Sequence, residues 1–300
     1  MKKIIQAAPN ISEARNKEIV EKIVDSVRGI DRVKLVDYSS DLSHNRTVIS
    51  LLGEADAVCM ALLELAKAVI KHIDMRKHTG DHPRMGSLDV CPLCPIKNIS
   101  MEETIILAKD LARKIGDIGI PVYLYEEAAS AAHRKNLADV RKGQYEGFFE
   151  KIKDPQWKPD FGPNEMNPIT GATAVSARTA LIAFNVNLTT SNLGIAQKIA
   201  RRIRYINGGL RYVKAMGVYL EEKGCAQVSM NLVDYKKTPI YQVVELIKIE
   251  AKRYGVGVAE TELIGLIPMD ALADSAQYYL QLEGLKNNQI VEYNLLEEEC

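Results

Sequence analysis

The chain has 300 residues, of which 47% are hydrophobic, and its 39 lysines and arginines balance its 39 aspartates and glutamates. This length suggests two domains, with ample apolar material for their cores. A formal net charge of zero argues against a nucleic-acid binder that relies on a basic field, and against a polybasic membrane-surface protein.

The N-terminus and the cysteines favour a cytoplasmic protein. Only a few apolar residues precede Pro9, too few for a signal peptide, and no apolar run approaches the length that spans a bilayer. The five cysteines form an odd and sparse set, which favours a reducing compartment over a disulfide framework. We therefore expect a cytoplasmic protein with small-molecule partners.

The first half of the chain predicts the element order βαββαβ, from apolar periodicity and turn residues. The expected elements are a strand over 3–8, a helix from a Ser12 cap to about Arg28, strands Val33–Asp37 and Arg46–Leu52, helix Glu54–His72 and strand Ser87–Cys91. Ser39–Asn45 is predicted as a polar loop. Ser100 and Glu103 form a capping-box pattern for a further helix to about Ile115, and 120–125 predicts another strand.

Residues 134–170 are predicted as a long aromatic connector with little periodicity. After it the order βαββαβ recurs. The expected elements are strand Ala180–Asn187, helix Ser191–Ile206, strands Leu210–Leu220 and Ala226–Val233, a helix opened by Thr238 and Pro239 to about Arg253, strand Val256–Ile264 and helix Met269–Glu283. The fold class is therefore α/β (α+β), with two ferredoxin-like βαββαβ sandwich subdomains over residues 1–178 and 179–300 and a ligand cleft between them.

The segment Ile73–Pro95 combines histidines, acids, arginines, glycines and prolines, a mixture typical of a shaped functional loop. His82 is the best candidate for proton transfer, because imidazole titrates near neutral pH. The neighbouring Asp81 can orient the imidazole and raise its pKa, and Arg84 can hold an anionic substrate.

A zinc site competes with this interpretation. His78 and His82, followed by Cys91 and Cys94, supply four potential ligands. Paired zinc-finger histidines lie on a helix, however, whereas Gly80 and Pro83 would break one here. We therefore expect no metal, and interpret both thiols as packing groups.

Three further clusters carry polar groups toward the expected cleft. Asn45 and Arg46 stand at a strand entrance, where an arginine can bind a carboxylate, and Asp41 precedes them. Asn10 lies at a strand-to-helix junction, where backbone N–H groups can bind an anion. The segment Asp160–Thr173 is aromatic and glycine-rich, and can hold a flat heterocycle.

Several motifs together resemble the glutamate formimidoyltransferase (formiminotransferase) family. The matching segments are Ala8–Glu13, His44–Val48, Ile73–Pro92, Val122–Tyr125, Pro159–Pro163, Gly171–Thr173 and Ile182–Asn187. The most specific is His82-Pro-Arg-Met-Gly-Ser-Leu-Asp-Val90, and the resemblance runs from about residue 5 to about residue 270. Since the chain ends at Cys300, we expect the monofunctional form without a cyclodeaminase domain.

This resemblance implies transfer of a formimino group from N-formimino-L-glutamate to tetrahydrofolate as co-substrate, a step of histidine degradation. It implies His82 as the acid/base and a homodimer. It places the folate-binding loop on Pro163, Asn164, Glu165, Met166, Asn167, Pro168, Ile169, Thr170, Gly171 and Ala172.

The chain departs from the family pattern at three places. Ala14 stands where the family often has glycine, and His44 where it often has threonine. A family aspartate falls on Ser39, so Asp41 is expected to take its role.

The chemistry suits these residues. Tetrahydrofolate N5 must lose a proton as it attacks the formimino carbon, and the departing glutamate nitrogen must gain one, so a single imidazole can serve both steps. Asp81 or Asp41 would stabilise the amidinium charge, and Arg46 and Arg84 would hold substrate carboxylates. Two alternatives remain: a folate-dependent formyltransferase that uses N-formylglutamate, and a non-catalytic module stabilised by zinc.

Overall fold

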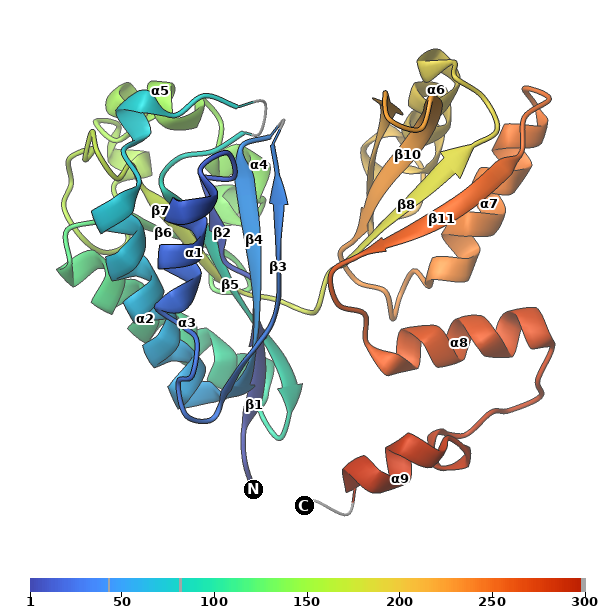
Figure 1. The fold of residues 1–300 in the computed structure, drawn as a ribbon, viewed down its shortest axis with the longest axis horizontal. Helices are drawn as coiled ribbons and strands as arrows, with labels where there is room; N and C mark the ends of the chain where they lie inside the picture. Colours follow the sequence, from blue (N-terminus) through green and yellow to red (C-terminus); the bar gives the residue numbers. More distant parts are fainter. Residues whose placement is uncertain (43, 81–82, 298–300) are drawn as a thin grey trace. The chain divides into compact units, whose positions relative to one another are not determined.

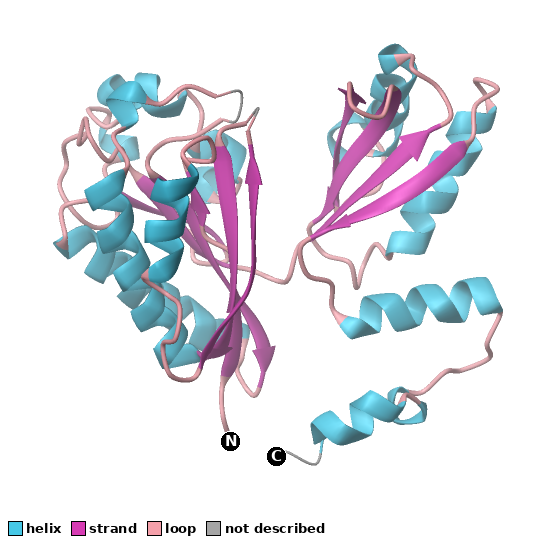
Figure 2. Ribbon diagram, viewed as in Figure 1, coloured by secondary structure: helices cyan, strands magenta, loops and turns pink. Residues whose placement is uncertain are grey.

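The computed structural model describes residues 1–42, 44–80 and 83–297. The chain divides into two compact units, Met1–Arg178 (unit 1) and Thr179–Cys300 (unit 2). Each unit has its own β-sheet and its own hydrophobic core, and the helices and sheets are distinguished by colour in Figure 2. Within the described ranges, no helix is both long and apolar enough to cross a membrane.

Unit 1 contains a seven-stranded sheet. Its elements are β1 (Ile4–Ala7), β2 (Asn10–Ile11), α1 (Lys17–Asp25), β3 (Val33–Asp41), β4 (Arg46–Glu54), α2 (Ala55–His72), β5 (Leu88–Lys97), α3 (Met101–Asp117), β6 (Val122–Glu126), α4 (Leu137–Val140), α5 (Gln144–Lys151) and β7 (Thr173–Ala177). In space β3 pairs with β4, β4 with both β1 and β2, and these with β5, all antiparallel. β7 and β6 then extend the sheet in parallel.

The predicted βαββαβ order is therefore confirmed as the first part of unit 1, with β1 and β2 together serving as the first strand. Helices α1, α2 and α3 pack beside one another over the sheet (Figure 1). The apolar stripe of α2 is buried as its spacing predicts, and the predicted capping box of Ser100 and Glu103 opens α3. The first strand is split because Pro9 interrupts its ladder, while the Pro9 carbonyl still accepts a hydrogen bond from Ile49 N at 3.0 Å.

Four predictions for unit 1 are wrong. Asn16, not Ser12, caps α1. β3 continues through Asp41, into the segment predicted as a polar loop. β5 continues to Lys97, because Pro92 and Pro95 each remove only one backbone donor from the ladder. The connector 134–170 contains α4 and α5, with Tyr145 and Phe148 of α5 buried.

Unit 2 has a four-stranded sheet in the order β11-β8-β10-β9. Its elements are β8 (Ile182–Leu188), α6 (Leu193–Ile203), β9 (Val213–Leu220), β10 (Cys225–Leu232), α7 (Ile240–Lys252), β11 (Val258–Ile264), α8 (Met269–Leu280) and α9 (Val291–Glu297). All pairings between the strands of this sheet are antiparallel. The βαββαβ order predicted here is confirmed, with Pro239 as the N-cap of α7 rather than its first residue. The ligand cleft stays a prediction.

Candidate active site

The segment that contains the predicted acid/base is anchored at both ends. Asp81 and His82 themselves lie outside the described residues. Before them, Asn45 Nδ2 donates to the Thr79 carbonyl at 2.9 Å, and Asn45 Oδ1 accepts from Ala14 N at 2.9 Å. Asn45 is buried and has a left-handed backbone (φ 47°). This residue therefore ties the N-terminal segment, the β3–β4 turn and the histidine segment together.

His78 adds a second tie between the same segments. Its Nε2 lies 3.0 Å from the Asn45 carbonyl, and its Nδ1 lies 3.2 Å from Nε of Arg84. Since an arginine can only donate, Nδ1 accepts and Nε2 carries the proton. Burial, assisted by the charge of Arg84, lowers the pKa of His78. His78 is thus held neutral, as an anchoring group.

Arg84 holds the other side of the segment. Its side chain is only 7% exposed, and its two Nη atoms contact the Glu146 carboxylate at 3.0 and 2.6 Å. Nη1 also donates to Gln144 Oε1 at 3.0 Å. The prediction that Arg84 binds a substrate carboxylate is untested, but the guanidinium already joins this segment to the first turn of α5.

The predicted folate segment lies against the residues that follow His82. Gly86 pairs with Gly171, Ser87 N donates to the Thr170 carbonyl at 2.7 Å, and Ala172 N donates to the Met85 carbonyl at 3.0 Å. A Cβ atom on Gly86 would lie 2.2 Å from the Ala172 carbonyl oxygen, so the two backbones meet where only glycine fits.

The rest of the folate segment is more exposed. Asn167 Oδ1 accepts from Ile169 N and Thr170 N at 2.9 and 3.2 Å, which shapes the turn, and the Pro168 carbonyl accepts from the Tyr145 hydroxyl at 2.5 Å. Met166 is buried. The side chains of Pro163, Asn164 and Glu165 are exposed.

Arg46 begins β4, opposite Asp41 in the register of β3. Burial first, and then the charge of Arg141, lower the pKa of Arg46, whereas the Asp41 and Asp89 carboxylates raise it. Asp41 Oδ2 lies 2.5 Å from Nδ1 of His44. Burial opposes ionisation of Asp41, but hydrogen bonds from His44 lower its pKa overall.

Arg141 is a residue that sequence reasoning missed. It follows α4, and its Nη2 contacts Oδ2 of the buried Asp89 at the start of β5. Asp89 Oδ1 accepts from Met85 N at 2.9 Å, which links Arg141 to the histidine segment. Its separation from Asp89 in the chain left no local pattern to find it by.

The N-terminal segment contributes through the pairing of β2 and through the side chain of Ser12. Asn10 sits in β2, opposite Val48 and Val90, with its Nδ2 donating to the Ala8 carbonyl at 3.0 Å. Ser12 donates its hydroxyl proton to the Gly86 carbonyl at 2.8 Å, instead of capping a helix. Both residues therefore border the histidine segment.

Cys91 and Cys94 are buried in β5, and burial raises the pKa of both thiols. Residues three apart on a strand point to opposite faces, which does not suit ligation of one zinc ion. Among the described residues, no group of three or more His, Cys, Asp or Glu side chains could hold a metal ion. Their burial and opposite orientations favour packing, and the absence of a metal stays a prediction because His82 lies outside the described residues.

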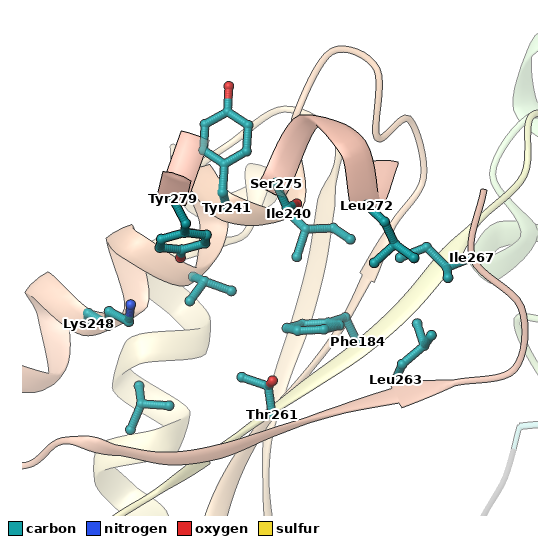
Figure 3. Close-up of a pocket in the computed structure, with 12 residues that line it drawn as sticks. Phe184, Ile240, Tyr241, Lys248, Thr261, Leu263, Ile267, Leu272, Ser275 and Tyr279 are labelled. Atoms are coloured by element: carbon teal, nitrogen blue, oxygen red, sulfur yellow. The ribbon is translucent and has the colours of Figure 1, made fainter. Parts of the chain in front are cut away.

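Unit 2 contains a cavity of about 350 Å³ between α7, α8, β8 and β11. Its lining is mostly apolar, with Phe184, Leu263 and Leu272 among the side chains shown in Figure 3. Lys248, the positively charged residue of this lining, forms an ion pair with Glu245 at 2.7 Å. This lining offers little for proton transfer, so the catalytic candidates remain in unit 1.

Comparison with known proteins identifies both units. Residues 4–178 match the N-terminal subdomain of the formiminotransferase domain, and residues 183–296 match the formiminotransferase domain model. A glutamate formimidoyltransferase from Streptococcus pyogenes is 48% identical over 99% of this chain and 100% of its own length. One from Thermoplasma acidophilum is 45% identical over 96% of both.

A chicken formimidoyltransferase-cyclodeaminase is 40% identical over 95% of this chain and 54% of its own length. Among solved structures, a microcompartment protein from Desulfitobacterium hafniense covers 90% of this chain and 98% of its own, at 11% identity and a TM-score of 0.24, too low to support an argument. The family models and the full-length relatives show that the chain belongs to the formiminotransferase family of transferases.

Proposed function

We propose that this chain transfers the formimino group of N-formimino-L-glutamate to tetrahydrofolate, with His82 as general acid/base. Its relatives named glutamate formimidoyltransferase support the transfer. The observation that carries the site is the anchoring of the histidine segment by Asn45 before His82 and by Arg84 and Gly86 after it. A segment fixed at both ends can hold an imidazole in a reactive position.

The chemistry needs one group that accepts and then returns a proton. N5 of tetrahydrofolate attacks the formimino carbon and forms a C–N bond, and the imidazole of His82 takes the proton that N5 releases. The bond to the glutamate nitrogen then breaks, and the imidazolium gives that nitrogen its proton. The products are 5-formiminotetrahydrofolate and L-glutamate, so atoms and charge balance.

The charged neighbours have matching roles. The formimino carbon is most electrophilic when its nitrogen is protonated, and the Asp41 or Asp81 carboxylate would stabilise that cation. Asp41 lies opposite Arg46 in the β3–β4 ladder, whereas Ser39, on which the family aspartate falls, lies opposite Val48. This pairing supports Asp41 for the role of that aspartate. Arg46 would hold a substrate carboxylate, and Arg84 could do so only beside Glu146.

The folate would lie along Pro163–Ala172. This segment presents exposed side chains at its start, while its end is fixed to Met85, Gly86 and Ser87. A co-substrate on this segment would therefore lie near the residues that follow His82. Asn10 borders the same region through β2. The homodimer and the cytoplasmic location also remain predictions, which gel filtration and cell fractionation can test.

The test is an assay of purified protein with tetrahydrofolate and N-formimino-L-glutamate, following 5-formiminotetrahydrofolate by its ultraviolet absorbance. We expect turnover, and a loss of about 10²–10⁴-fold in His82→Ala without a change in melting temperature. His133→Ala, at an exposed histidine bonded to the Gln156 carbonyl, is the matched control and should retain turnover. Turnover of His82→Ala within about threefold of the unsubstituted enzyme would refute the role of His82.

The formyltransferase is tested in the same assay with a second donor, and the zinc-stabilised module by metal analysis. Product formation from N-formylglutamate at a comparable rate would favour a formyltransferase. Stoichiometric zinc in the purified protein, with unfolding by chelator, would favour a zinc-stabilised module.

A further inference from the structure

Arg141 is held in place by an unusual backbone clamp. The ammonium group of Lys151 donates to the carbonyl oxygens of Asp139, Val140 and Lys142, at 2.9, 2.6 and 3.1 Å. These carbonyls lie on both sides of Arg141, at the C-terminal end of α4. The position of the Arg141 backbone is thereby fixed relative to α5.

The guanidinium of Arg141 has donors to spare. A guanidinium carries five N–H groups. Within the described ranges its hydrogen bond is the one from Nη2 to Asp89, and its Nε is buried without a partner. Arg134 shares the buried Nε without a partner, but it differs at its Nη atoms. Both of them donate hydrogen bonds, to Asp160 and to two backbone carbonyls at 2.7–2.9 Å. Arg134 is therefore committed to the fold, whereas Arg141 retains binding capacity.

Arg141 also lies close enough to Arg46 for the two charges to repel each other. This repulsion adds to burial in lowering the pKa of Arg46. Two cations in a shielded site destabilise the protein unless anions compensate them. Asp41 and Asp89 supply part of that compensation, and each already has a close partner of its own, His44 and Arg141 respectively.

We propose that Arg141 and Arg46 form a subsite for a substrate carboxylate, the α- or γ-carboxylate of a glutamyl group. The proposal rests on the proposed function, in which both the donor and the folate tail carry such groups. Arginine suits this role because its planar fork pairs with a carboxylate through two hydrogen bonds. Asp89 is a positioning residue that orients Arg141 and binds the backbone of the histidine segment.

The test measures KM for each substrate separately in Arg141→Gln. We expect KM to rise about 10- to 100-fold for one substrate, with a smaller change in kcat. A rise for N-formimino-L-glutamate assigns the subsite to the donor. A rise for tetrahydrofolate that is absent with tetrahydropteroate, which lacks the glutamyl tail, assigns it to the acceptor. Arg134→Gln is the matched control, with a lower melting temperature but both KM values kept.

A second variant guards against misfolding, because Arg141→Gln leaves Asp89 buried without its cation. Arg141→Lys keeps the positive charge but loses the planar guanidinium group that can form two hydrogen bonds to one carboxylate. Calorimetric titration with L-glutamate and p-aminobenzoyl-L-glutamate then measures binding without catalysis. Weaker binding in Arg141→Lys supports the subsite even if the enzyme lacks formimino transfer, a result that would refute only the proposed function. Unchanged KM values and unchanged binding in both folded variants would overturn the subsite and leave the transfer intact.

Discussion

The two units share one arrangement of strands but differ in what surrounds it. In both, two outer strands flank an inner pair in the same βαββαβ order. Unit 1 adds β6 and β7 with the helices between them, and all five histidines of the chain fall in it. Unit 2 adds α8 and α9, and has a mostly apolar pocket that is open to solvent on one side.

The difference indicates that the shared framework alone does not define the candidate site. In unit 1 the candidate site combines residues of the strands, such as Asn10, Asp41 and Arg46, with segments outside the ladder. These segments are the turn before β4, the residues before β5 and the segment before β7. The corresponding strands of unit 2 carry an amide and carboxylate network, with Asn187 donating to Glu260 and accepting from Gln227. A function is placed by such additions, not by the fold that supports them.

The largest expected difference between the units comes from replacing one buried asparagine in each. Asn45→Ala removes two hydrogen bonds and leaves a non-glycine residue at positive φ, so it should cost about 2–4 kcal/mol of unfolding free energy and most of the turnover. Asn187→Ala should cost about 1–3 kcal/mol and retain turnover while folded.

Urea unfolding can report these effects separately. The single tryptophan, Trp157, lies in unit 1, so its fluorescence follows that unit, while circular dichroism follows both. If Asn187→Ala shifts the tryptophan transition as much as Asn45→Ala does, the two units do not unfold independently, and the contrast drawn above fails.

A second comparison uses glycines at close backbone contacts. A Cβ on Gly86 would meet the Ala172 carbonyl at 2.2 Å, and one on Gly217 would meet Gln197 N of α6 at 2.4 Å. Each alanine variant should therefore lose about 1–3 kcal/mol of stability through overpacking. Only Gly86→Ala should also lower kcat. The kcat of each variant is measured well below the melting temperatures of both variants. Equal kcat losses would mean that the contact in unit 2 matters equally to the chemistry.

The smallest expected effect concerns pH. Burial keeps the pKa of His78 in the folded protein below its ordinary value. As pH falls through about 6.5, His78 therefore binds a proton in the unfolded chain more readily than in the native state, which favours unfolding. Stability of unit 1 should therefore fall between about pH 7 and pH 5, less steeply in His78→Gln. Tryptophan-monitored urea titrations at several pH values measure both slopes. Identical slopes would show that His78 is not the group responsible.

Much of the fold follows from local patterns. The α2 stripe, the α3 capping box and the strands of unit 2 are visible as periodicity or as cap residues. The errors have physical reasons. Pairing with β1 and β7 stabilises β5 as a strand beyond its two prolines. β7 has only five residues, too few to show an alternating pattern in the sequence. α5 begins after Gly143, which has a left-handed backbone conformation and supplies no side-chain cap by which the start of the helix could be predicted.

The site was predictable where its residues cluster in sequence. Asn45 and Arg46 were singled out because unusual residue types stand together, and the family resemblance placed the predicted folate segment. Their roles stay predictions. The network that orients them was not predicted, since Arg84 meets Glu146, and Asp89 meets Arg141, only after the chain has folded. Ser12 was misassigned for the same reason, because its partner is Gly86.

These distant partnerships have a consequence for the order of assembly during synthesis. The histidine segment acquires its last anchors from Glu146 of α5 and from Thr170 and Gly171, which emerge from the ribosome long after His82 itself. A nascent chain that has completed β5 therefore contains the predicted acid/base but not yet all the residues that anchor its segment. We therefore expect the segment to be fully anchored only after the residues up to Gly171 have been synthesised and the strand that follows them has joined the sheet.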